Sequence, residues 1–574
     1  MSFCFLFFAA ALSAQAPTPI YIGDDAPPWM HMMQAEQPDV FAIQKAYKDW
    51  FAARPFEKNS YTNYYKRWMR WARPFAQADG SLHLPDPAQD AAKEKKVQAQ
   101  RAASSALAAR RRQKSDWTFV GPKQTYHTDG QTVVTWQTNI YCFDISTYNP
   151  GILYAGGESG GMWKTTDKGM NWTLLTTDVL HDAFNALIIH PDNPNIVFAG
   201  TRGKIIKTAD GGATWTTVYS AGNLRVNEFA FCSVTGSGEI FLAATSAGIL
   251  RTVNGGNTWS QTSANETWTI KTKTGDLSTV FAIRKNGSSA DFLRSTNGGN
   301  TWTAFNGGLY APQNGEAVTG AIIAICPSKP EQLYSYFCGS GSNLAGYIGV
   351  FKSTDGGSSW SNTNPSGAIG NSPTPYAVPA HANIMASNGT TGLQQGFYDM
   401  AIVVNPANSE QLIAGGTSWY RSNDGGRTWT GLGSYIGGLS WSHPDIQWCA
   451  ASGNDLWIAS DGGLNYSADW ATTIEARMNG ISGSDMWGFD AGWNEDILVG
   501  GRYHNGNMAY YQKFPEGKFY RMGGAESATG YVNPGPERKV YHSDIGGHII
   551  KGDFAEGVTR FPVGAFPNES YAYY

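Results

Sequence analysis

Short apolar runs separated by turn residues dominate the chain from about residue 117 to its end. One stretch shows the pattern clearly, with apolar runs at 185–190, 195–200, 204–208 and 214–218 and with turn residues such as Asn, Pro, Asp and Gly between them. Runs of this length bounded by such residues are typical of β-strands. The stretch therefore predicts a unit of four short antiparallel strands.

The unit recurs along the chain. A Ser/Thr-x-Asp/Asn-x-Gly-x-x-Trp motif lies between its third and fourth runs, and most copies are about 44 residues apart. A four-stranded unit cannot bury both of its faces alone, so repeated units stack radially and bury one another. The sequence therefore predicts an all-β fold, a β-propeller of four-stranded blades, with a short N-terminal helical segment.

The motif has a physical explanation that assigns its polar residues to the fold. The Asp or Asn side chain accepts hydrogen bonds from nearby backbone N–H groups, the Gly adopts a conformation closed to other residues, and the Trp packs between strands or blades. We therefore expect these positions to hold the structure and not to catalyse a reaction. They are Asp167, Asp210, Asn254, Asn297, Asp355 and Asp424, and a shortened copy follows at 467–470.

Composition and pattern divide the chain into five parts. Residues 1–14 read as a secretory signal peptide, because a short apolar run precedes a small-residue cleavage site. Residues 15–86 are predicted to be helical, with an aromatic stripe that we expect to dock onto the propeller, and residues 87–116 form an Ala/Arg-rich linker. Residues 117–480 are predicted to form a seven-bladed propeller, and residues 481–574 further blades that start a second one. A single larger ring is the alternative.

Composition also excludes several classes of function. Charged residues make up only 15% of the chain and its net charge is -4, so no strong field attracts nucleic acid. No apolar stretch after the signal peptide approaches the ~20 residues of a membrane helix. Removal of Cys4 with the signal peptide leaves an odd set of cysteines, without the spacing of a zinc site. We predict no cofactor, no metal and no membrane span.

The six complete motifs resemble the Asp-box (BNR) repeats of sialidases, sortilin-type receptors and two-propeller xyloglucan-degrading glycoside hydrolases. The resemblance covers about residues 117–574 and implies the propeller fold far more specifically than any function. The helical segment followed by these blades also looks like large exported proteins of Bacteroidetes-type bacteria. We therefore expect a secreted or cell-surface protein, with the type nine secretion machinery as a partner if a C-terminal sorting domain is missing from this chain.

The resemblance to the two-propeller hydrolases implies catalytic carboxylates in Asp-x-Gly-Gly loops. Residues 157–161 are similar to the first loop, with Glu158 in place of Asp, and residues 543–547 are similar to the second and contain Asp544. The two carboxylates of an inverting enzyme lie ~6.5–9.5 Å apart, and those of a retaining enzyme ~5–5.5 Å. The early Arg-Ile-Pro motif and the arginine triad of sialidases have no counterpart here, so we do not expect sialidase activity.

Other polar residues are predicted to lie in loops on the same face, after the second strand of a blade or between blades. A long insertion at 363–395 is expected to overhang this face, either touching a ligand or decorating the surface. His443 and Asp445 alone are too few ligands for a metal. The candidate binding residues are His443, Asp445, Asp461, Arg502 and His504, with Tyr376 and His381 from the insertion.

Two functions stay open at this point. In the first, an exported β-propeller binds a glycan or an extracellular protein through its face loops. In the second, a glycoside hydrolase acts on a β-glucan or a xyloglucan-like polysaccharide in a cleft between propellers. We favour binding, because the sequence contains no complete catalytic set.

Overall fold

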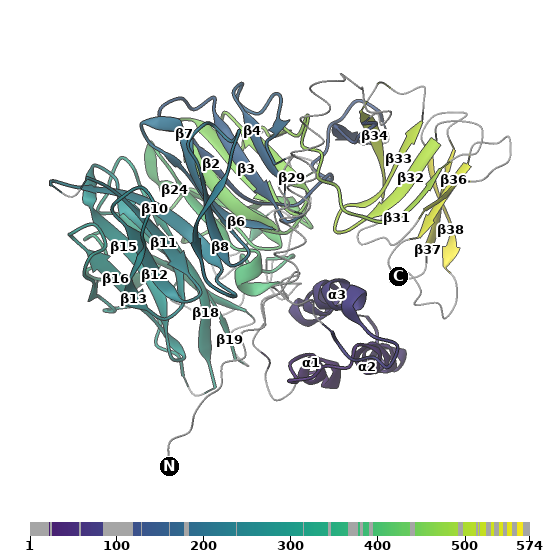
Figure 1. Ribbon diagram of the computed structural model, residues 1–574, viewed down its shortest axis with the longest axis horizontal. Helices are drawn as coiled ribbons and strands as arrows, with labels where there is room; N and C mark the ends of the chain where they lie inside the picture. Colours follow the sequence, from purple (N-terminus) through teal and green to yellow (C-terminus); the bar gives the residue numbers. More distant parts are fainter. Residues whose placement is uncertain are drawn as a thin grey trace, which may run out of the picture. The chain divides into compact units, whose positions relative to one another are not determined.

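The computed structural model describes residues 22–565 of the 574-residue chain, apart from several gaps (Figure 1). The predicted signal peptide and the predicted linker at 87–116 lie outside the described residues. The gaps are 23–25, 57–58, 84–118, 128, 160, 177–182, 237, 314, 342–345, 365–376, 379–382, 390–393, 437–441, 492–496, 512–514, 516, 524–529, 533–538, 544–547 and 554–558.

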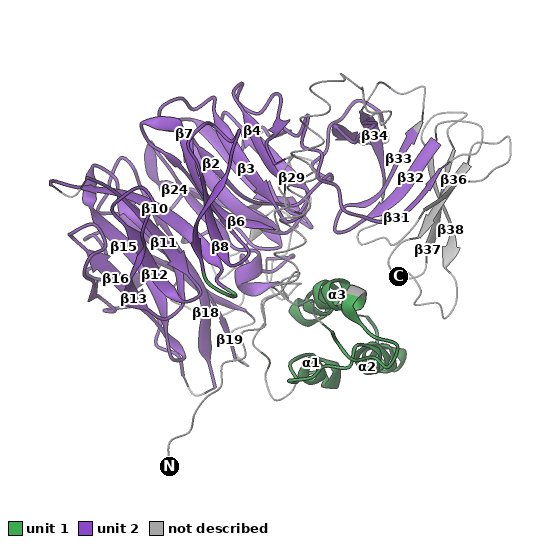
Figure 2. Cartoon of the chain, in the orientation of Figure 1, with its two compact units in different colours: residues 1–118, 221–223 green, residues 119–220, 224–574 purple. Residues whose placement is uncertain are grey.

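The chain divides into two compact units (Figure 2). Residues 1–118 and 221–223 form the first, and residues 119–220 and 224–574 form the second. The first unit contains the helices α1(Pro28–Met33), α2(Val40–Ala52) and α3(Ser60–Ala72) and the 3-10 helix η1(Arg73–Phe75). None of the helices in the described residues is long and apolar enough to cross a membrane.

The helices of the first unit begin at residues that cap them. Asp39 accepts a hydrogen bond from the N–H of Ala42 at the start of α2. Asn59 and Thr62 form a reciprocal capping box at the start of α3. Each cap satisfies N–H groups that have no partner inside the helix, which explains why the helices start at these positions.

The aromatic stripe of the first unit packs inside that unit. Tyr47 and Tyr65 stack with their ring centroids 3.6 Å apart, and Trp29 meets both rings edge-on. Trp68 is buried in the same hydrophobic cluster. The stripe therefore supplies the core of the helical unit.

Seven four-stranded antiparallel sheets follow one another in the described part of the second unit. The first sheet contains β2(Ile140–Ile145), β3(Leu153–Gly157), β4(Met162–Thr165) and β5(Thr173–Leu174), and the second contains β6(Phe184–His190), β7(Asn193–Thr201), β8(Lys204–Thr208) and β9(Thr216–Ser220). The third sheet contains β10(Val226–Val234), β11(Gly238–Thr245), β12(Gly248–Thr252) and β13(Ser260–Ala264). The fourth contains β14(Thr267–Lys273), β15(Asp276–Asn286), β16(Ser289–Ser295) and β17(Thr303–Ala304).

The last three sheets of this series are built in the same order. The sixth also carries the short strand β22(Ala377–Val378), which pairs with β26 at its edge. The fifth sheet contains β18(Ala317–Ile325), β19(Leu333–Ser340), β20(Tyr347–Ser353) and β21(Ser361–Asn362). The sixth contains β23(Ala401–Asn405), β24(Asn408–Gly415), β25(Ser418–Ser422) and β26(Trp429–Ser434), and the seventh contains β27(Ile446–Ser452), β28(Asp455–Ser460), β29(Gly463–Ser467) and β30(Glu475–Ala476).

The seven sheets form a closed ring (Figure 1). The first strands of successive sheets contact one another in chain order, and β2 of the first sheet contacts β27 of the seventh. At this closure Trp172 packs in one cluster with Trp457, and its indole N–H donates to the carbonyl oxygen of Arg477 at 3.0 Å. The prediction of an all-β propeller of four-stranded blades is confirmed.

Two further sheets follow the ring. They are β31(Met486–Ala491), β32(Ile497–Arg502), β33(Gly506–Tyr511) and β34(Lys518–Gly523), and β35(Gly530–Val532), β36(Lys539–Ser543), β37(His548–Asp553) and β38(Thr559–Ala565). The short strand β1(Gln124–Tyr126) precedes the ring in the chain but pairs in parallel with β34. The interval 117–480 that we assigned to one propeller therefore contains a strand that belongs to the next sheet.

The copies of the repeated motif form the same turn. In the second copy, Asp210 accepts hydrogen bonds from the hydroxyl of Thr208 (2.8 Å) and from the N–H (2.9 Å) and hydroxyl (2.6 Å) of Thr214. The hydroxyl oxygen of Thr208 accepts the N–H of Gly212. Equivalent contacts hold the turns at Asp167, Asn254, Asn297, Asp355, Asp424 and, in the shortened copy, Asp469.

Candidate functional site

Three predicted site residues lie together in the second unit. Asp445 immediately precedes β27, Asp461 lies in the turn between β28 and β29, and His504 lies in the turn between β32 and β33. One ligand atom from each side chain lies within 4.8 Å of the other two, and all three residues are buried. We call Asp445, Asp461 and His504 the buried triad.

The Asp461 carboxylate is the most extensively contacted member of the triad. It is 0% exposed. The side-chain amide of Gln447 donates to Oδ1 at 2.8 Å, and the hydroxyl of Tyr398 donates to Oδ2 at 3.3 Å. Nδ1 of His504 faces Oδ2 at 3.4 Å. Groups from three separate stretches of the chain therefore hold this one carboxylate.

The surroundings of Asp461 change its acidity. Burial raises its pKa to about 7, and the carboxylates of Asp445 and Glu158 act in the same direction, while His504 opposes them. Removal from water and nearby like charge both disfavour the ionised carboxylate. Asp461 therefore keeps its proton until close to neutral pH.

Two members of the triad have left-handed backbone conformations. The φ angle is 68° at Asp445 and 59° at His504. A non-glycine residue in this region costs on the order of 1–3 kcal/mol, and such residues gather at functional sites. Backbone hydrogen bonds fix Asp445 in place: its N–H donates to Thr417 and its carbonyl oxygen accepts the N–H of Asp461.

His443 supports the triad and does not belong to it. Its Nε2 lies 2.8 Å from the carbonyl oxygen of His504, its Nδ1 lies 2.6 Å from that of Pro444, and its ring packs against Trp136. Burial lowers the pKa of His443 to about 4. Both ring nitrogens face backbone oxygens, so the ligand-forming histidine beside Asp445 is His504.

Arg502 also serves the turn that carries His504. Its guanidinium is fully buried and donates to the carbonyl oxygens of Gly506 (3.2 Å) and Asn505 (2.9 Å). Burial, with a smaller effect of Arg521, lowers its pKa to about 9. These contacts stabilise the turn between β32 and β33, so the role of Arg502 is structural.

Glu158 lies in the turn between β3 and β4 and is only half-buried. The side-chain amide of Asn139 donates to its carboxylate at 2.6 Å, and the amide of Asn505 donates to the Asn139 oxygen at 3.1 Å. Asn505 also donates to the backbone carbonyl of Asp461 at 2.9 Å. A chain of amides thus connects Glu158 to the triad. Asp544 lies outside the described residues.

The described part of the long insertion is packed into the fold. Ile384, Met385 and Ala386 are 0% exposed, and Tyr420 donates its hydroxyl to the carbonyl oxygen of Ala386 at 2.7 Å. We expected the insertion to overhang the ring face, but this stretch lies between the fifth and sixth sheets, because its apolar residues join the cluster between them. Tyr376 and His381 lie outside the described residues.

The sequence analysis missed the short 3-10 helix η2(Gly396–Tyr398). The hydroxyl of Tyr398 contacts the hydroxyl of Tyr141 on β2 at 3.1 Å, while Phe397 packs near Trp268 on β14 with centroids 6.4 Å apart. β2 and β14 are the first strands of the first and fourth sheets, so η2 lies across the centre of the ring. The run Phe397-Tyr398-Asp399, at the end of the insertion, is the sequence signal that marks it.

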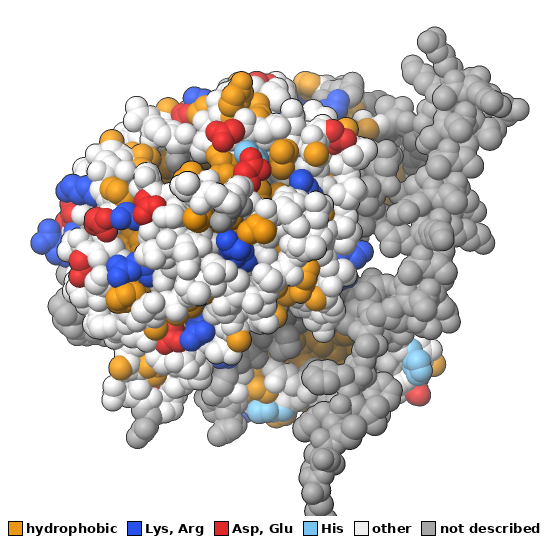
Figure 3. Space-filling model, turned by 60° about the vertical axis from the view of Figure 1, so that its left-hand side comes forward, with side chains coloured by type: hydrophobic (Ala, Val, Ile, Leu, Met, Phe, Trp, Pro, Cys, Tyr) orange, Lys and Arg blue, Asp and Glu red, His pale blue; other side chains and the backbone are white. Residues whose placement is uncertain are grey.

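The surface of the ring carries mixed charge. Lys and Arg side chains are mixed with Asp and Glu side chains on the face drawn in Figure 3.

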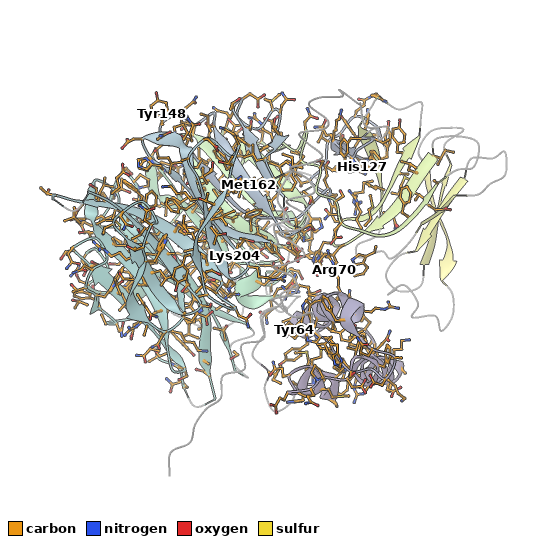
Figure 4. All side chains as sticks on the ribbon, viewed as in Figure 1. Tyr64, Arg70, His127, Tyr148, Met162 and Lys204 are labelled. Atoms are coloured by element: carbon orange, nitrogen blue, oxygen red, sulfur yellow. The ribbon has the colours of Figure 1, made fainter. Side chains whose placement is uncertain are left out.

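Figure 4 labels Tyr148, which is 70% exposed in the turn between β2 and β3, and Met162, which is fully buried. Because adjacent strands are antiparallel, Tyr148 lies at the opposite end of its sheet from Glu158.

Comparison with known protein families finds no match, and comparison with curated proteins finds none either. Among solved structures, an ancestral GH74 enzyme aligns with 79% of the chain at 14% identity and a TM-score of 0.54. The chain covers 64% of that enzyme, which is less than two thirds of its length. At this identity the likeness shows the propeller fold alone.

Two other solved structures are similar at lower scores. A GH74 xyloglucanase from Xanthomonas campestris shares 12% identity, with 76% of this chain and 82% of that one covered and a TM-score of 0.44. YCF48 from Cyanidioschyzon merolae shares 16% identity, with 57% and 95% covered and a TM-score of 0.38.

Proposed function

We propose that the chain is a secreted or cell-surface β-propeller that binds a glycan at the ring face carrying Glu158. The supporting observation is a half-buried carboxylate whose neighbouring segment is hydrogen-bonded to the residues just before the aromatic strand β31. The hydroxyl of Thr138 donates to Gly483 at 2.6 Å and that of Ser484 donates to Gln137 at 2.5 Å. These bonds bring the residues just before β31 next to the segment 137–139, and Asn139 of this segment donates to the Glu158 carboxylate.

Strand β31 carries exposed and half-buried aromatic side chains. Phe489 is 58% exposed, and the half-buried Trp487 stacks on Tyr503 with centroids 5.1 Å apart. Aromatic faces pack against the apolar CH faces of sugar rings, and a carboxylate accepts hydrogen bonds from sugar hydroxyls. The pair of groups therefore fits a glycan.

Calorimetric titration with β-glucan and xyloglucan oligosaccharides tests this proposal. Glu158→Gln and Trp487→Ala are each expected to weaken binding about tenfold, which corresponds to ~1.4 kcal/mol. Tyr148→Ala is the matched control, because it removes an exposed aromatic ring at the other end of the sheet, and it should bind as the wild type does. Absence of binding across a glycan array, or equal affinity in all variants, would contradict the proposal, and specific capture of an extracellular protein would favour that partner instead.

Glycoside hydrolysis is the second candidate, and one observation favours it. Burial raises the pKa of Asp461 to about 7, and the carboxylate of Glu158 acts on Asp461 electrostatically. A pair of carboxyl groups, one of them with a raised pKa, is the usual acid and base of such enzymes. Release of reducing ends from β-glucan or xyloglucan, abolished by Glu158→Gln and by Asp544→Asn, would establish turnover. Binding without any release of reducing ends would leave the binding function alone.

A further inference from the structure

We propose that Asp445, Asp461 and His504 bind a divalent first-row metal ion such as Zn²⁺. The three side chains offer two carboxylate oxygens and one imidazole nitrogen within 4.8 Å of one another. Carboxylate and imidazole ligands together suit ions of this class. The inference does not depend on glycan binding, which a separate titration measures.

One distance inside the triad fits two ligands of one ion, and the third ligand atom lies within 4.8 Å of both. Nδ1 of His504 and Oδ2 of Asp461 are 3.4 Å apart, longer than the ~2.7–2.9 Å of a direct charge-assisted hydrogen bond. Two ligands at about 2.0–2.1 Å from a tetrahedral zinc ion are separated by about 3.4 Å. The observed distance therefore matches two ligands that share a metal.

A fourth buried oxygen lies beside the triad. The amide nitrogen of Asn505 donates to the backbone carbonyl of Asp461 at 2.9 Å, which places this side chain at the site. Asn505 is only 2% exposed, and its oxygen accepts no hydrogen bond from the described residues. A buried acceptor in this position is satisfied by a metal or by a water molecule bound to it.

The electrostatics of the site also favour a cation. Asp461 is 0% exposed, and burial of an ionised carboxylate is costly unless positive charge compensates it. The side chains that contact Asp461 are the amide of Gln447, the phenol of Tyr398 and the imidazole of His504, and none of these is a permanent cation. A divalent ion would supply the compensating charge.

The ion would join two neighbouring sheets. Asp445 and Asp461 belong to the seventh sheet of the ring, whereas His504 belongs to the sheet formed by β31–β34. The metal would therefore act as a structural clamp that holds the turn between β32 and β33, and with it Tyr503 and the stacked Trp487, against the ring.

Metal analysis of the purified full-length chain tests the clamp directly. After dialysis in metal-free buffer, we expect about one Zn²⁺ or Mn²⁺ ion per wild-type chain, and a loss of at least fivefold in Asp445→Asn and in His504→Gln. Added ZnCl₂ should raise the Tm of EDTA-treated wild type by several degrees and leave the Tm of both variants unchanged. Glu239→Gln is the control, because Glu239 forms a carboxylate–histidine pair with His190 elsewhere in the ring (2.9 Å).

Titration of the wild type with Co²⁺ keeps the test independent of variant folding. We expect one saturable site whose visible absorption is lost when Zn²⁺ displaces the bound Co²⁺. The proposal is overturned if the wild type takes up no ion and shows no Tm response to Zn²⁺ or Mn²⁺. It is equally overturned if Asp445→Asn and His504→Gln bind the ion as the wild type does.

Discussion

The surroundings of the aspartates in this protein shift their pKa values in opposite directions. Asp210 and Asp355 sit in exposed turns, where hydrogen bonds from neighbouring hydroxyl and N–H groups lower the pKa of each to about 2. Asp461 follows a serine as part of an ordinary Ser-Asp-Gly-Gly turn, yet burial raises its pKa to about 7. Local sequence predicts a turn in each case, but the degree of desolvation comes from residues distant in the chain, so the sequence could not predict it.

The raised pKa of Asp461 predicts how stability depends on pH. The folded protein binds a proton at Asp461 between pH ~4 and ~7 that the unfolded chain releases, so the free energy of unfolding falls as the pH rises through this window. Asp461→Asn should remove part of this fall, on the order of 2–4 kcal/mol. Urea unfolding at intervals from pH 4 to 8, with EDTA present, measures the change.

Two comparisons make the pH experiment specific. The groups that face Asp461 are His504, Asp445, Glu158 and Tyr398, and all of them stay in place in Asp461→Asn. Asp210→Asn should instead change the slope only at low pH, because the lowered pKa of Asp210 stabilises the fold above pH ~4 and this stability is lost as the pH falls toward 2. An unchanged slope from pH 4 to 7 in Asp461→Asn would show that Asp461 titrates normally.

The motif turn is the element that the sequence predicts best. Its residues form the expected hydrogen bonds even in the shortened copy, where Trp470 and Ala471 take left-handed φ angles of 55° and 62° at positions that are glycine in most copies. Contacts with the rest of the sheet hold these residues in a conformation that their own preferences oppose. By contrast, nothing in the Pro- and Ser-rich composition of the insertion predicts that Ile384 and Met385 fill a space between two sheets.

The chain contains its own control for the role of the motif aspartate. Asn254 and Asn297 replace Asp in two turns and accept the same backbone N–H as Asp210 does. Asp210→Asn should therefore leave the Tm almost unchanged, whereas Asp210→Ala, which leaves the N–H of Thr214 without its acceptor, should lower the Tm clearly. Thermal unfolding of both variants distinguishes them, and equal Tm values would mean that the carboxylate does not hold the turn.

At the scale of the whole molecule, the repeat predicts blades but not their partners. The two units expected after residue 480 correspond to the sheets β31–β34 and β35–β38. The three residues of β1, however, pair with β34 almost 400 positions later. A pattern of two or three residues contains no information about a distant strand, so periodicity alone could not find this pairing. All three triad residues were candidates from the sequence, but periodicity could not predict that His504 joins the two aspartates, since the members come from loops of two different sheets.

Closure of the ring between its first and seventh sheets can be tested with a matched pair of tryptophans. Trp172 is 5% exposed and its backbone N–H donates to the carbonyl oxygen of Asn479 across the closure, while Trp360 is 6% exposed and its backbone N–H donates to that of Gly307 across an interface inside the series. In a closed ring the two positions are equivalent, so Trp172→Ala and Trp360→Ala should each cost about 3–5 kcal/mol. Scanning calorimetry should show one lowered transition of similar size in both variants. A Trp172→Ala protein that melts like the wild type, beside a strongly destabilised Trp360→Ala protein, would mean that the first and seventh sheets do not support each other and that the ring is open in solution.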